Sequence, residues 1–434
     1  SSVISGLNIS QTRRYRLRYT TDNPAVIANG TYVNLPQTLD ITNYTTPYVN
    51  NISGIVACGG TAFTVTPTDG SGNIVPAGTK YTWTIATPNA NLTGATDQSL
   101  SQSIISQTLT NTSITPQSIS YSVTPITSNN CLGDPFSINV TVNPTPQIAT
   151  VTTPVICSDQ TLSFTPVNVT NGIIPAGTTY TWTVVPNANV TGESDITSPQ
   201  SSIGLSQTLR NTTTTLQTVV YNVTPISSLN CSGAIFTLNV PVNPRPYIDN
   251  KSYAICSNTA FTFIPVGGDK IPTGTTYTWS NPPTVTGGLT GGTTGSNQNI
   301  VGGTLVNPSN TSQTATYNVI ANSNGCLSTQ FSATATIYAR PLITTQNVWS
   351  CSGSAFSVPL SNGGGNILPN ATTFTWTVVQ NSNVTGASNV NVATNAITQT
   401  LTNITNTDQI VTYSVTPISG TEGNCVGQPF TVNV

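Results

Sequence analysis

Cysteine is the residue type in this chain with the clearest potential for chemistry. The eight cysteines form two alternating sets of four: Cys58, Cys157, Cys256 and Cys351, and Cys131, Cys231, Cys326 and Cys425. Thiols can bind zinc, act as nucleophiles or form disulfides. The chain has no histidine and no Cys-x-x-Cys pair, so zinc binding and activated-thiol chemistry are poorly supported. Eight cysteines in a turn-rich chain instead predict disulfides made in an oxidising compartment.

The acidic residues add no convincing second site. They number twelve, are scattered, and form no Asp-x-Asp-x-Asp run that would bind calcium. Glu193 and Asp195 could form a carboxylate pair for glycoside hydrolysis, but the matching turns elsewhere in the chain lack such a pair. Without histidine the chain also lacks the usual general base. We therefore predict no catalytic residue, no metal site, no cofactor and no enzymatic activity.

Basic residues gather near the N-terminus. Four of the ten lie within residues 12–19, where a strand would place Arg14, Arg16 and Arg18 on one face. These three arginines could contact an anion or a partner domain. The plainer alternative is a charged strand face that is covered only by water.

The overall charge argues against two classes of partner. Charged residues make up only 5% of the chain, and the formal net charge is −2. An average soluble domain has roughly 25% charged residues. We therefore expect no attraction to nucleic acid or to anionic membranes. No apolar run reaches the ~18–20 residues of a spanning helix, so no membrane insertion is expected in this segment.

A repeating set of strands must position the cysteines. An aromatic-Thr-Trp-Thr/Ser motif occurs four times, with its tryptophans 99, 97 and 97 residues apart, and a Tyr-x-Val motif follows each copy. The tryptophans are Trp83, Trp182, Trp279 and Trp376, and the tyrosines are Tyr121, Tyr221, Tyr317 and Tyr413. Alternating apolar and polar residues place both motifs in strands, so we predict that these side chains mark the core. Stacking of the tryptophans on sugars is the alternative.

These patterns predict an all-β chain of tandem immunoglobulin-like β-sandwiches. The expected segments are an atypical N-terminal segment at 1–50, either a cap or the tail of a preceding domain, and four repeats at 51–144, 145–244, 245–340 and 341–434. Short Asn-Pro-x-Pro linkers favour stiff junctions and an extended rod. The last repeat stops inside its final strand, which suggests a longer array.

Two disulfide connectivities are compatible with this architecture. Each repeat has one cysteine before its second strand and one in the tip before its last strand, 73, 74, 70 and 74 residues apart. Pairing within each repeat is the simpler choice. In an immunoglobulin-like sandwich, however, these two places lie at opposite ends, roughly 25 Å apart, whereas a disulfide needs ~6 Å between Cα atoms. A head-to-tail array would instead favour the pairs Cys58–Cys231, Cys157–Cys326 and Cys256–Cys425.

The two connectivities differ in which cysteines they leave unpaired. Pairing between repeats would leave Cys131 and Cys351 to bond outside this set of four repeats. Trp349 lies just before Cys351 and outside the repeated Trp motif, and we expect it to pack against its neighbours. Both connectivities remain open from the sequence.

The recurring motifs resemble those of a known family. Ile-Pro-Ala-Gly-Thr-Thr-Tyr-Thr-Trp-Thr, Ser-Gln-Thr-Leu-x-Asn-Thr, Tyr-x-Val-Thr-Pro-Ile and Phe-x-x-Asn-Val-x-Val-Asn-Pro resemble the PKD-like repeats of very large surface proteins from gliding, Flavobacterium-type Bacteroidota, such as the SprB-type adhesins. The resemblance covers about residues 51–434. It implies an immunoglobulin-like fold, type IX secretion and a cell-surface or filament location. The third repeat departs at Ala321-Asn322, and residues 1–50 match nothing in the pattern.

The function expected from these features is structural. We predict a segment of an extracellular adhesin or filament, a stiff disulfide-bonded stalk for surface attachment or gliding. Its partners would be neighbouring repeats of the same chain or filament. Surface polysaccharide is a further candidate partner. The alternatives are carbohydrate-binding modules that contact polysaccharide directly, and accessory domains of a secreted enzyme.

Overall fold

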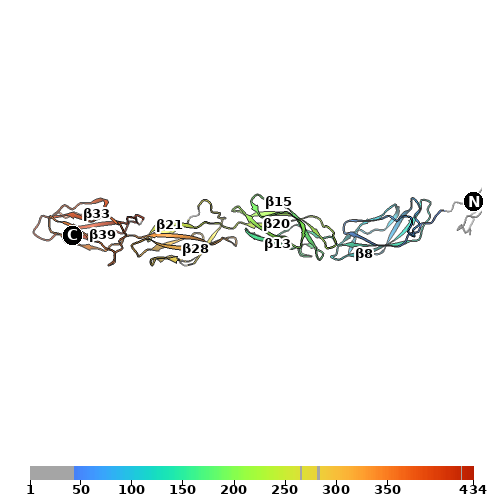
Figure 1. The fold of residues 1–434 in the computed structure, drawn as a ribbon, viewed down its shortest axis with the longest axis horizontal. Helices are drawn as coiled ribbons and strands as arrows, with labels where there is room; N and C mark the ends of the chain where they lie inside the picture. The colour runs from blue at the N-terminus through green and yellow to red at the C-terminus, as the bar shows by residue number, and fades with distance from the viewer. Residues whose placement is uncertain (1–43, 264–265, 281–283, 422) are drawn as a thin grey trace, which may run out of the picture. The chain divides into compact units, whose positions relative to one another are not determined.

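The computed structural model describes residues 44–263, 266–280, 284–421 and 423–434, and every labelled element in Figure 1 is a strand. No helix occurs among these residues. The chain separates into two compact units. The first contains the chain through Ala149 with Pro166–Tyr180 and Thr224–Ile235, and the second contains Thr150–Thr165, Thr181–Val223 and Phe236–Val434. The first unit therefore combines repeat 1 with one tip of repeat 2. Arg14, Arg16 and Arg18 lie outside the described residues, so the N-terminal basic face stays a prediction.

The strands of the first two repeats follow the same order. In repeat 1 they are β1 (Ile52–Cys58), β2 (Ala62–Val65), β3 (Lys80–Thr87), β4 (Leu92–Thr93), β5 (Gln98–Gln102), β6 (Ile105–Thr108), β7 (Thr110–Asn111), β8 (Gln117–Ile126) and β9 (Phe136–Asn143). In repeat 2 they are β10 (Gln147–Ile148), β11 (Val151–Thr152), β12 (Ile156–Cys157), β13 (Gln160–Phe164), β14 (Gly172–Ile173), β15 (Thr179–Val185), β16 (Val190–Thr191), β17 (Ile196–Gln200), β18 (Ile203–Asn211), β19 (Gln217–Ile226) and β20 (Phe236–Asn243).

The last two repeats use the same plan. In repeat 3 the strands are β21 (Lys251–Cys256), β22 (Ala260–Thr262), β23 (Thr276–Trp279), β24 (Thr284–Val285), β25 (Thr290–Gly291), β26 (Gly295–Gln298), β27 (Gly302–Val306), β28 (Gln313–Ser323), β29 (Cys326–Leu327) and β30 (Phe331–Tyr338). In repeat 4 they are β31 (Gln346–Asn347), β32 (Ala355–Ser357), β33 (Thr373–Val379), β34 (Val384–Thr385), β35 (Val390–Thr394), β36 (Thr398–Thr400), β37 (Thr402–Asn403), β38 (Thr412–Ile418) and β39 (Phe430–Asn433).

Each repeat is a two-layered β-sandwich, so the predicted fold class is confirmed. The larger sheet of repeat 1 has the order β1-β9-β8-β3-β5, and the pairs β2-β6 and β4-β7 form the facing layer. The first strand runs parallel to the last, and the other neighbours in the sheet are antiparallel. From Ile119 onward β8 alternates buried and half-buried residues, which is the period-2 pattern of a strand with one face in the core.

The recurring aromatic residues lie in the cores. Trp83, Trp182, Trp279 and Trp376 are at most 6% exposed, and Tyr121, Tyr221, Tyr317 and Tyr413 are at most 1% exposed. Each indole N–H donates to a backbone carbonyl, as Trp182 Nε1 does to Ser194 O at 3.1 Å. A buried indole keeps this polar group satisfied while its ring fills the space between the layers. The tryptophans are therefore not available as exposed sugar platforms.

A glutamine satisfies the buried tyrosine in three repeats. Tyr221 Oη donates to Gln207 Oε1 at 2.8 Å, and Gln207 Nε2 donates to Ser194 O at 2.7 Å. Gln107 and Gln399 accept from the corresponding tyrosines at 2.7 and 3.0 Å. Burial raises the pKa of Tyr121 to about 12, so the phenol keeps the proton that it donates.

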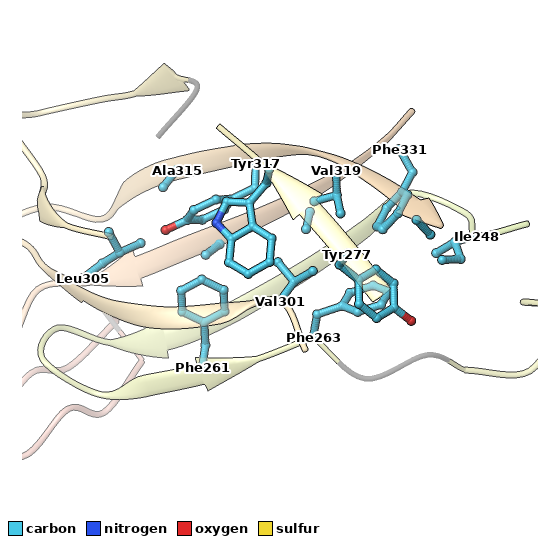
Figure 2. Close-up of a cluster of buried hydrophobic side chains, with 14 of the residues drawn as sticks. Ile248, Phe261, Phe263, Tyr277, Val301, Leu305, Ala315, Tyr317, Val319 and Phe331 are labelled. Carbon is cyan, nitrogen blue, oxygen red and sulfur yellow. The ribbon is translucent and has the colours of Figure 1, made fainter. Parts of the chain in front are cut away.

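Repeat 3 lacks this glutamine. Gly303 occupies the position on β27, and Tyr317 Oη is buried with no hydrogen-bond partner among the described residues. Figure 2 shows the Tyr317 ring inside the cluster with Phe261 and Leu305, and the Phe261 and Tyr317 centroids are 5.7 Å apart. Apolar packing therefore holds this ring without the polar bridge of the other repeats.

Trp349 contradicts its expected packing. Its side chain is 90% exposed, and the prediction that it packs against its neighbours is wrong. In the four Trp motifs the tryptophan lies in an inner strand of the larger sheet, such as β3 between β8 and β5, and points into the core. Trp349 instead follows β31 and precedes Cys351 in a segment without strand pairing, so no facing layer covers it.

Candidate functional site: the disulfide-linked junctions

Each junction brings together two turns. One is the A–B turn, which begins at the first cysteine of a repeat and leads into its second strand. The other is the F–G tip, which joins the long central strand to the last strand and carries the second cysteine. In repeat 1 these are the turn at Cys58 between β1 and β2, and the tip at Cys131 between β8 and β9.

The F–G tip is shaped by local hydrogen bonds. In repeat 2, Ser227 N donates to Cys231 O at 3.0 Å, and the Cys231 amide donates to Ser227 Oγ at 3.1 Å. Asn230 adopts a positive φ of 61° just before the cysteine. Asparagine tolerates this left-handed conformation better than most residues. The other tips repeat the feature at Asn130, Asn324 and Asn424. The tip sequence therefore fixes where the thiol points.

The F–G tip packs closely against the backbone of the linker that opens its own repeat. A Cβ atom on Gly233 would lie 2.2 Å from Pro146 O in the linker that opens the same repeat. Gly133 and Gly427 stand in the same relation to Pro47 O and Pro341 O, at 2.1 and 2.4 Å. Glycine is required at these positions because any side chain would collide with the carbonyl.

The A–B turn is anchored by an asparagine that the sequence analysis missed. Asn211 is 5% exposed, and its Nδ2 donates to Thr215 O and Val242 O at 2.8 and 2.9 Å. The backbone N–H of Asn211 donates to Ser158 Oγ at 3.1 Å, which connects Asn211 to the residue beside Cys157. Its signal in the sequence was the repeated Leu-x-Asn that ends the Ser-Gln-Thr-Leu motif.

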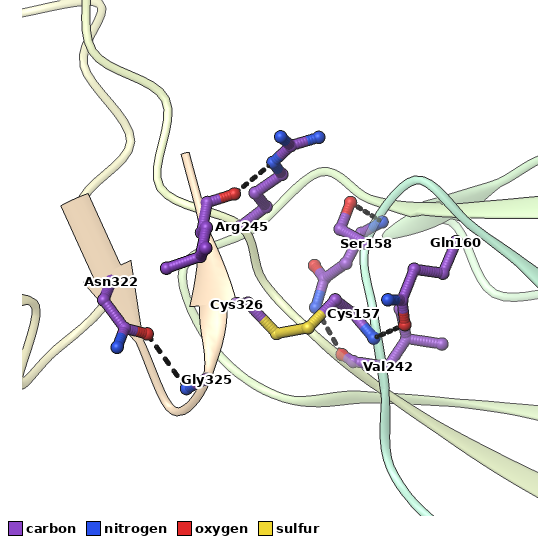
Figure 3. Close-up of a disulfide and its surroundings, with 10 residues drawn as sticks. Cys157, Ser158, Gln160, Val242, Arg245, Asn322, Gly325 and Cys326 are labelled. Carbon is purple, nitrogen blue, oxygen red and sulfur yellow. Dashed lines mark hydrogen bonds between the residues drawn. A yellow bond between two sulfur atoms is a disulfide. The ribbon is translucent and has the colours of Figure 1, made fainter. Parts of the chain in front are cut away.

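The structure joins cysteines of successive repeats. The disulfides are Cys58–Cys231, Cys157–Cys326 and Cys256–Cys425, with Cα–Cα distances of 5.5, 5.5 and 5.6 Å. In each, the A–B turn of one repeat bonds to the F–G tip of the next, and no disulfide lies within a repeat. Figure 3 shows Cys157 and Cys326 meeting in this way. These are the pairs expected for a head-to-tail array.

Polar contacts accompany the disulfides. At the first junction Thr145 Oγ1 donates to Gly59 O at 2.8 Å. At the second, Arg245 Nε donates to Leu327 O, beside Cys326, and Figure 3 shows this bond next to the disulfide. At the third, Arg340 Nη2 donates to Thr259 Oγ1 at 3.0 Å, so each junction is fixed by a covalent bond and by neighbouring hydrogen bonds.

Two cysteines are left unpaired in the described chain. Cys131 is half-buried in the tip of repeat 1, and Cys351 is exposed in the A–B turn of repeat 4. They occupy the same places in their repeats as the paired cysteines, but neither forms a disulfide within the described residues. Ser257, beside Cys256, is 5% exposed, whereas Ser352, beside Cys351, is exposed. These thiols occupy the two positions that the same pattern leaves open.

Asp195 has a structural contact. Asp195 Oδ1 accepts the Val184 amide at 2.7 Å, so this carboxylate bridges neighbouring strands. Among the described residues no group of three or more His, Cys, Asp or Glu side chains could hold a metal ion. The same part of the chain has no helix long and apolar enough to cross a membrane.

One carboxylate is held in an internal ion pair. Lys251 Nζ lies 3.0 Å from Asp269 Oδ1, and both side chains are largely buried. Burial alone would raise the pKa of Asp269, but hydrogen bonds from the Val266 amide, the Lys251 ammonium and the Asp249 amide outweigh it. The net pKa is lowered, so Asp269 stays charged and organises the loop before β23.

Comparison with known families places these repeats. A family model described as PKD-like domain matches four successive segments, residues 56–146, 154–246, 253–341 and 348–434. The matches cover most of the chain, and each contains one Trp motif and the two cysteine positions. The chain belongs to the PKD-like domain family. Its PKD-like domains are thus the four sandwiches described above.

Solved structures with similar folds share little sequence with these PKD-like domains. The human desmocollin-1 ectodomain is 11% identical, with a TM-score of 0.25 over 89% of this chain and 80% of that one. The titin I-band fragment I67–I69 is 10% identical, with a TM-score of 0.29 over 69% and 100%. A SusE-like surface-located polysaccharide-binding protein from the Bacteroides thetaiotaomicron heparin utilisation locus is 14% identical, with a TM-score of 0.22 over 90% and 71%.

No functional conclusion comes from these similarities, because their identities and TM-scores are low. No curated protein matches the chain significantly. The combination of tandem PKD-like domains with disulfides fits an extracellular structural or adhesion-type segment, since disulfides persist in oxidising compartments outside the cytoplasm.

Proposed function

We propose that this chain is a tension-bearing segment of an extracellular adhesin or filament. In this segment the disulfides between PKD-like domains bear the pulling force, so the domain cores are not pulled apart. The observation that carries the proposal is the disulfide connectivity. Each bond leaves a repeat at its A–B turn and enters the next at its F–G tip.

The covalent path through the chain is short. From Cys58 it crosses a disulfide to Cys231, follows only 25 positions through β20 and β21 to Cys256, and crosses a second disulfide to Cys425. The backbone route from Cys58 to Cys425 is 367 positions long. Force would follow the shorter route, since its strands are already extended. The remaining strands of repeats 2 and 3 would carry little load.

A second covalent path interlaces with the first. It runs from Cys131 over 26 positions to Cys157, crosses the disulfide to Cys326, and continues over 25 positions to Cys351. Both of its ends are the unpaired cysteines. A stalk built in this way would resist unfolding under load while its cores supply only the scaffold.

The finer identity rests on the sequence resemblance. We propose a cell-surface location, export by type IX secretion, and a role in surface attachment or gliding in the style of SprB-type adhesins. Neighbouring repeats of the same chain or filament would be the partners. The chain would have no enzymatic activity, because it lacks histidine, the usual general base, and Asp195 is engaged by the Val184 amide.

The alternative is a set of carbohydrate-binding modules, or accessory domains of a secreted enzyme. The buried tryptophans make repeated sugar stacking through the Trp motif a poor mechanism. Any binding of polysaccharide would have to use other, exposed residues.

Single-molecule stretching tests the mechanical proposal. In the oxidised protein the part between Cys58 and Cys425 should extend to only ~90 Å, whereas full reduction should release ~1,200 Å, at ~3.4 Å per residue. Replacing Cys256 and Cys425 by serine should restore much of the unfolding length, since the short path is then cut.

The matched control replaces Cys131 and Cys351 by serine, which removes two thiols without cutting any disulfide of the chain. That variant should remain as inextensible as the original. An oxidised protein that unfolds repeat by repeat, with steps like those of the reduced protein, contradicts the proposal.

A further inference from the structure

The junction between repeats 2 and 3 contains a basic pocket. A cavity of about 180 Å³ lies beside the Cys157–Cys326 disulfide and is lined by Arg210 from repeat 2 and by Arg245 and Lys270 from repeat 3. Asp159 is the one carboxylate among its described lining residues. Three cations in one pocket are notable because the whole chain has only ten.

The three cations come from separate places in the sequence, and the other junctions do not gather them. Arg210 pairs with Thr191 where the other repeats have Thr110, Val306 and Thr402 in the same register. Lys270 bridges to Tyr247 where the other repeats have Ile74, Ile173 and Ile367. Arg245 corresponds to Thr145 at the first junction and to Arg340 at the third. No other junction has a cation at more than one of these positions.

The chain itself uses only part of their hydrogen-bonding capacity. Arg245 donates its Nε to Leu327 O, and Lys270 Nζ donates to Thr212 O at 2.7 Å. Arg210 Nε lies 3.9 Å from Asp159 Oδ1, a loose pair between exposed side chains. Among the described residues no hydrogen bond engages the terminal nitrogens of Arg210 or Arg245, so these remain for a ligand. A guanidinium presents parallel N–H groups that match a carboxylate or sulfate.

An aromatic side chain completes one wall. Tyr247 is 49% exposed, and its hydroxyl donates to Asp249 Oδ1 at 2.9 Å, which holds the ring in place. The pocket is smaller than the ~300–1,000 Å³ of drug-sized sites. It therefore suits one charged sugar unit of a longer polymer, whose ring could lie against the tyrosine.

We propose that this pocket binds an anionic sugar unit, carboxylated or sulfated, of an extracellular polysaccharide. The site differs from the repeated Trp motif and occurs at one junction only. The Cys157–Cys326 disulfide holds its two halves together, since Cys157 precedes the lining residues Ser158 and Asp159, and Cys326 lies three positions before the lining residue Thr329. This inference goes beyond the mechanical role and does not depend on it.

The test measures binding of the oxidised chain to immobilised polygalacturonate, dextran sulfate and neutral dextran. The pocket variant Arg210→Thr, Arg245→Thr and Lys270→Ile installs residues that other repeats carry at these positions, so its thermal unfolding should be unchanged. It should bind the anionic polymers about ten-fold more weakly or worse, because each lost charge-assisted contact contributes on the order of one decade. Neutral dextran should not bind to either protein.

A charge-matched control separates this site from general attraction. Arg13→Ser, Lys80→Thr and Arg340→Thr also removes three cations, none of them among the pocket residues or the predicted Arg14, Arg16 and Arg18 face, and should leave the affinity unchanged. An equal loss in that control, or full binding by the pocket variant, overturns the proposal. Cys157→Ser with Cys326→Ser should weaken binding without removing any ligand contact. A preference between polygalacturonate and dextran sulfate identifies the anionic group.

Discussion

At the scale of single residues, the four repeats show how one polar side chain supports a buried ring. Gln107, Gln207 and Gln399 each accept the hydroxyl of the core tyrosine in their repeat. Repeat 3 has Gly303 instead and leaves Tyr317 Oη unpaired. A buried polar group without a partner costs ~1–3 kcal/mol, so repeat 3 carries a local defect.

Filling this position should stabilise repeat 3. A Cβ on Gly303 would have its nearest neighbour at 3.9 Å, so the backbone position admits a side chain such as that of Gly303→Gln. Bonding to Tyr317, together with the loss of a flexible strand glycine, should add ~1–2 kcal/mol. Hydrogen exchange of the β28 amides measures the change. In the Tyr317→Phe background the same substitution should gain clearly less, and an equal gain there would show that the hydrogen bond is not the cause.

At the scale of elements, the F–G tip is the part that connects repeats. Its shape depends on an asparagine with positive φ, on hydrogen bonds around the cysteine, and on a glycine that touches the linker. The tip is therefore held by its own repeat before it reaches the A–B turn of the preceding one. A change in the tip should alter the disulfide without unfolding the sandwich.

Gly233→Ala should weaken the first junction selectively. The added methyl group would lie 2.2 Å from Pro146 O, and relief of this clash must displace the tip, at a cost of ~1–3 kcal/mol. Cys58–Cys231 should then be reduced at lower dithiothreitol concentration than Cys157–Cys326, as measured by differential alkylation and mass spectrometry. Gly267→Ala, where no atom lies within 4 Å, is the control. Unchanged reduction of Cys58–Cys231 would argue against this role of the tip.

At the scale of the whole molecule, three disulfides link four repeats in one repeating connectivity. The two unpaired cysteines occupy the two remaining positions of that connectivity, one in a tip and one in an A–B turn. Trp349 is exposed close to Cys351. This end of repeat 4 thus resembles the surface that the F–G tip covers at the other junctions.

The unpaired thiols should therefore join two molecules head to tail. Oxidation at high protein concentration should give a ladder on non-reducing gels, with Cys351 of one molecule linked to Cys131 of another. Cys131→Ser and Cys351→Ser should each abolish the ladder while the three disulfides within the chain persist. Peptide mapping that finds mainly Cys351–Cys351 links would contradict a tip-to-turn contact and indicate nonspecific oxidation.

The sequence by itself determined the fold class and the core. Strand periodicity, the Trp motif and the Tyr-x-Val motif are local signals, since alternation along a strand states which face is buried. They indicated four sandwiches and placed Trp182 and Tyr221 in a core. The prediction that Trp349 is packed was wrong because burial depends on a facing layer. The residues next to Trp349 in the sequence do not show whether such a layer is present.

Tertiary structure decided the connectivity and the junction sites. Whether Cys157 bonds to Cys231 or to Cys326 depends on which ends of the sandwiches meet, and the sequence left both pairings open. Likewise, Arg210 and Lys270 lie 60 positions apart in the sequence and share a pocket only because two repeats are joined there. Distances between remote residues follow from folding and from the packing of neighbouring domains, and no local pattern records them.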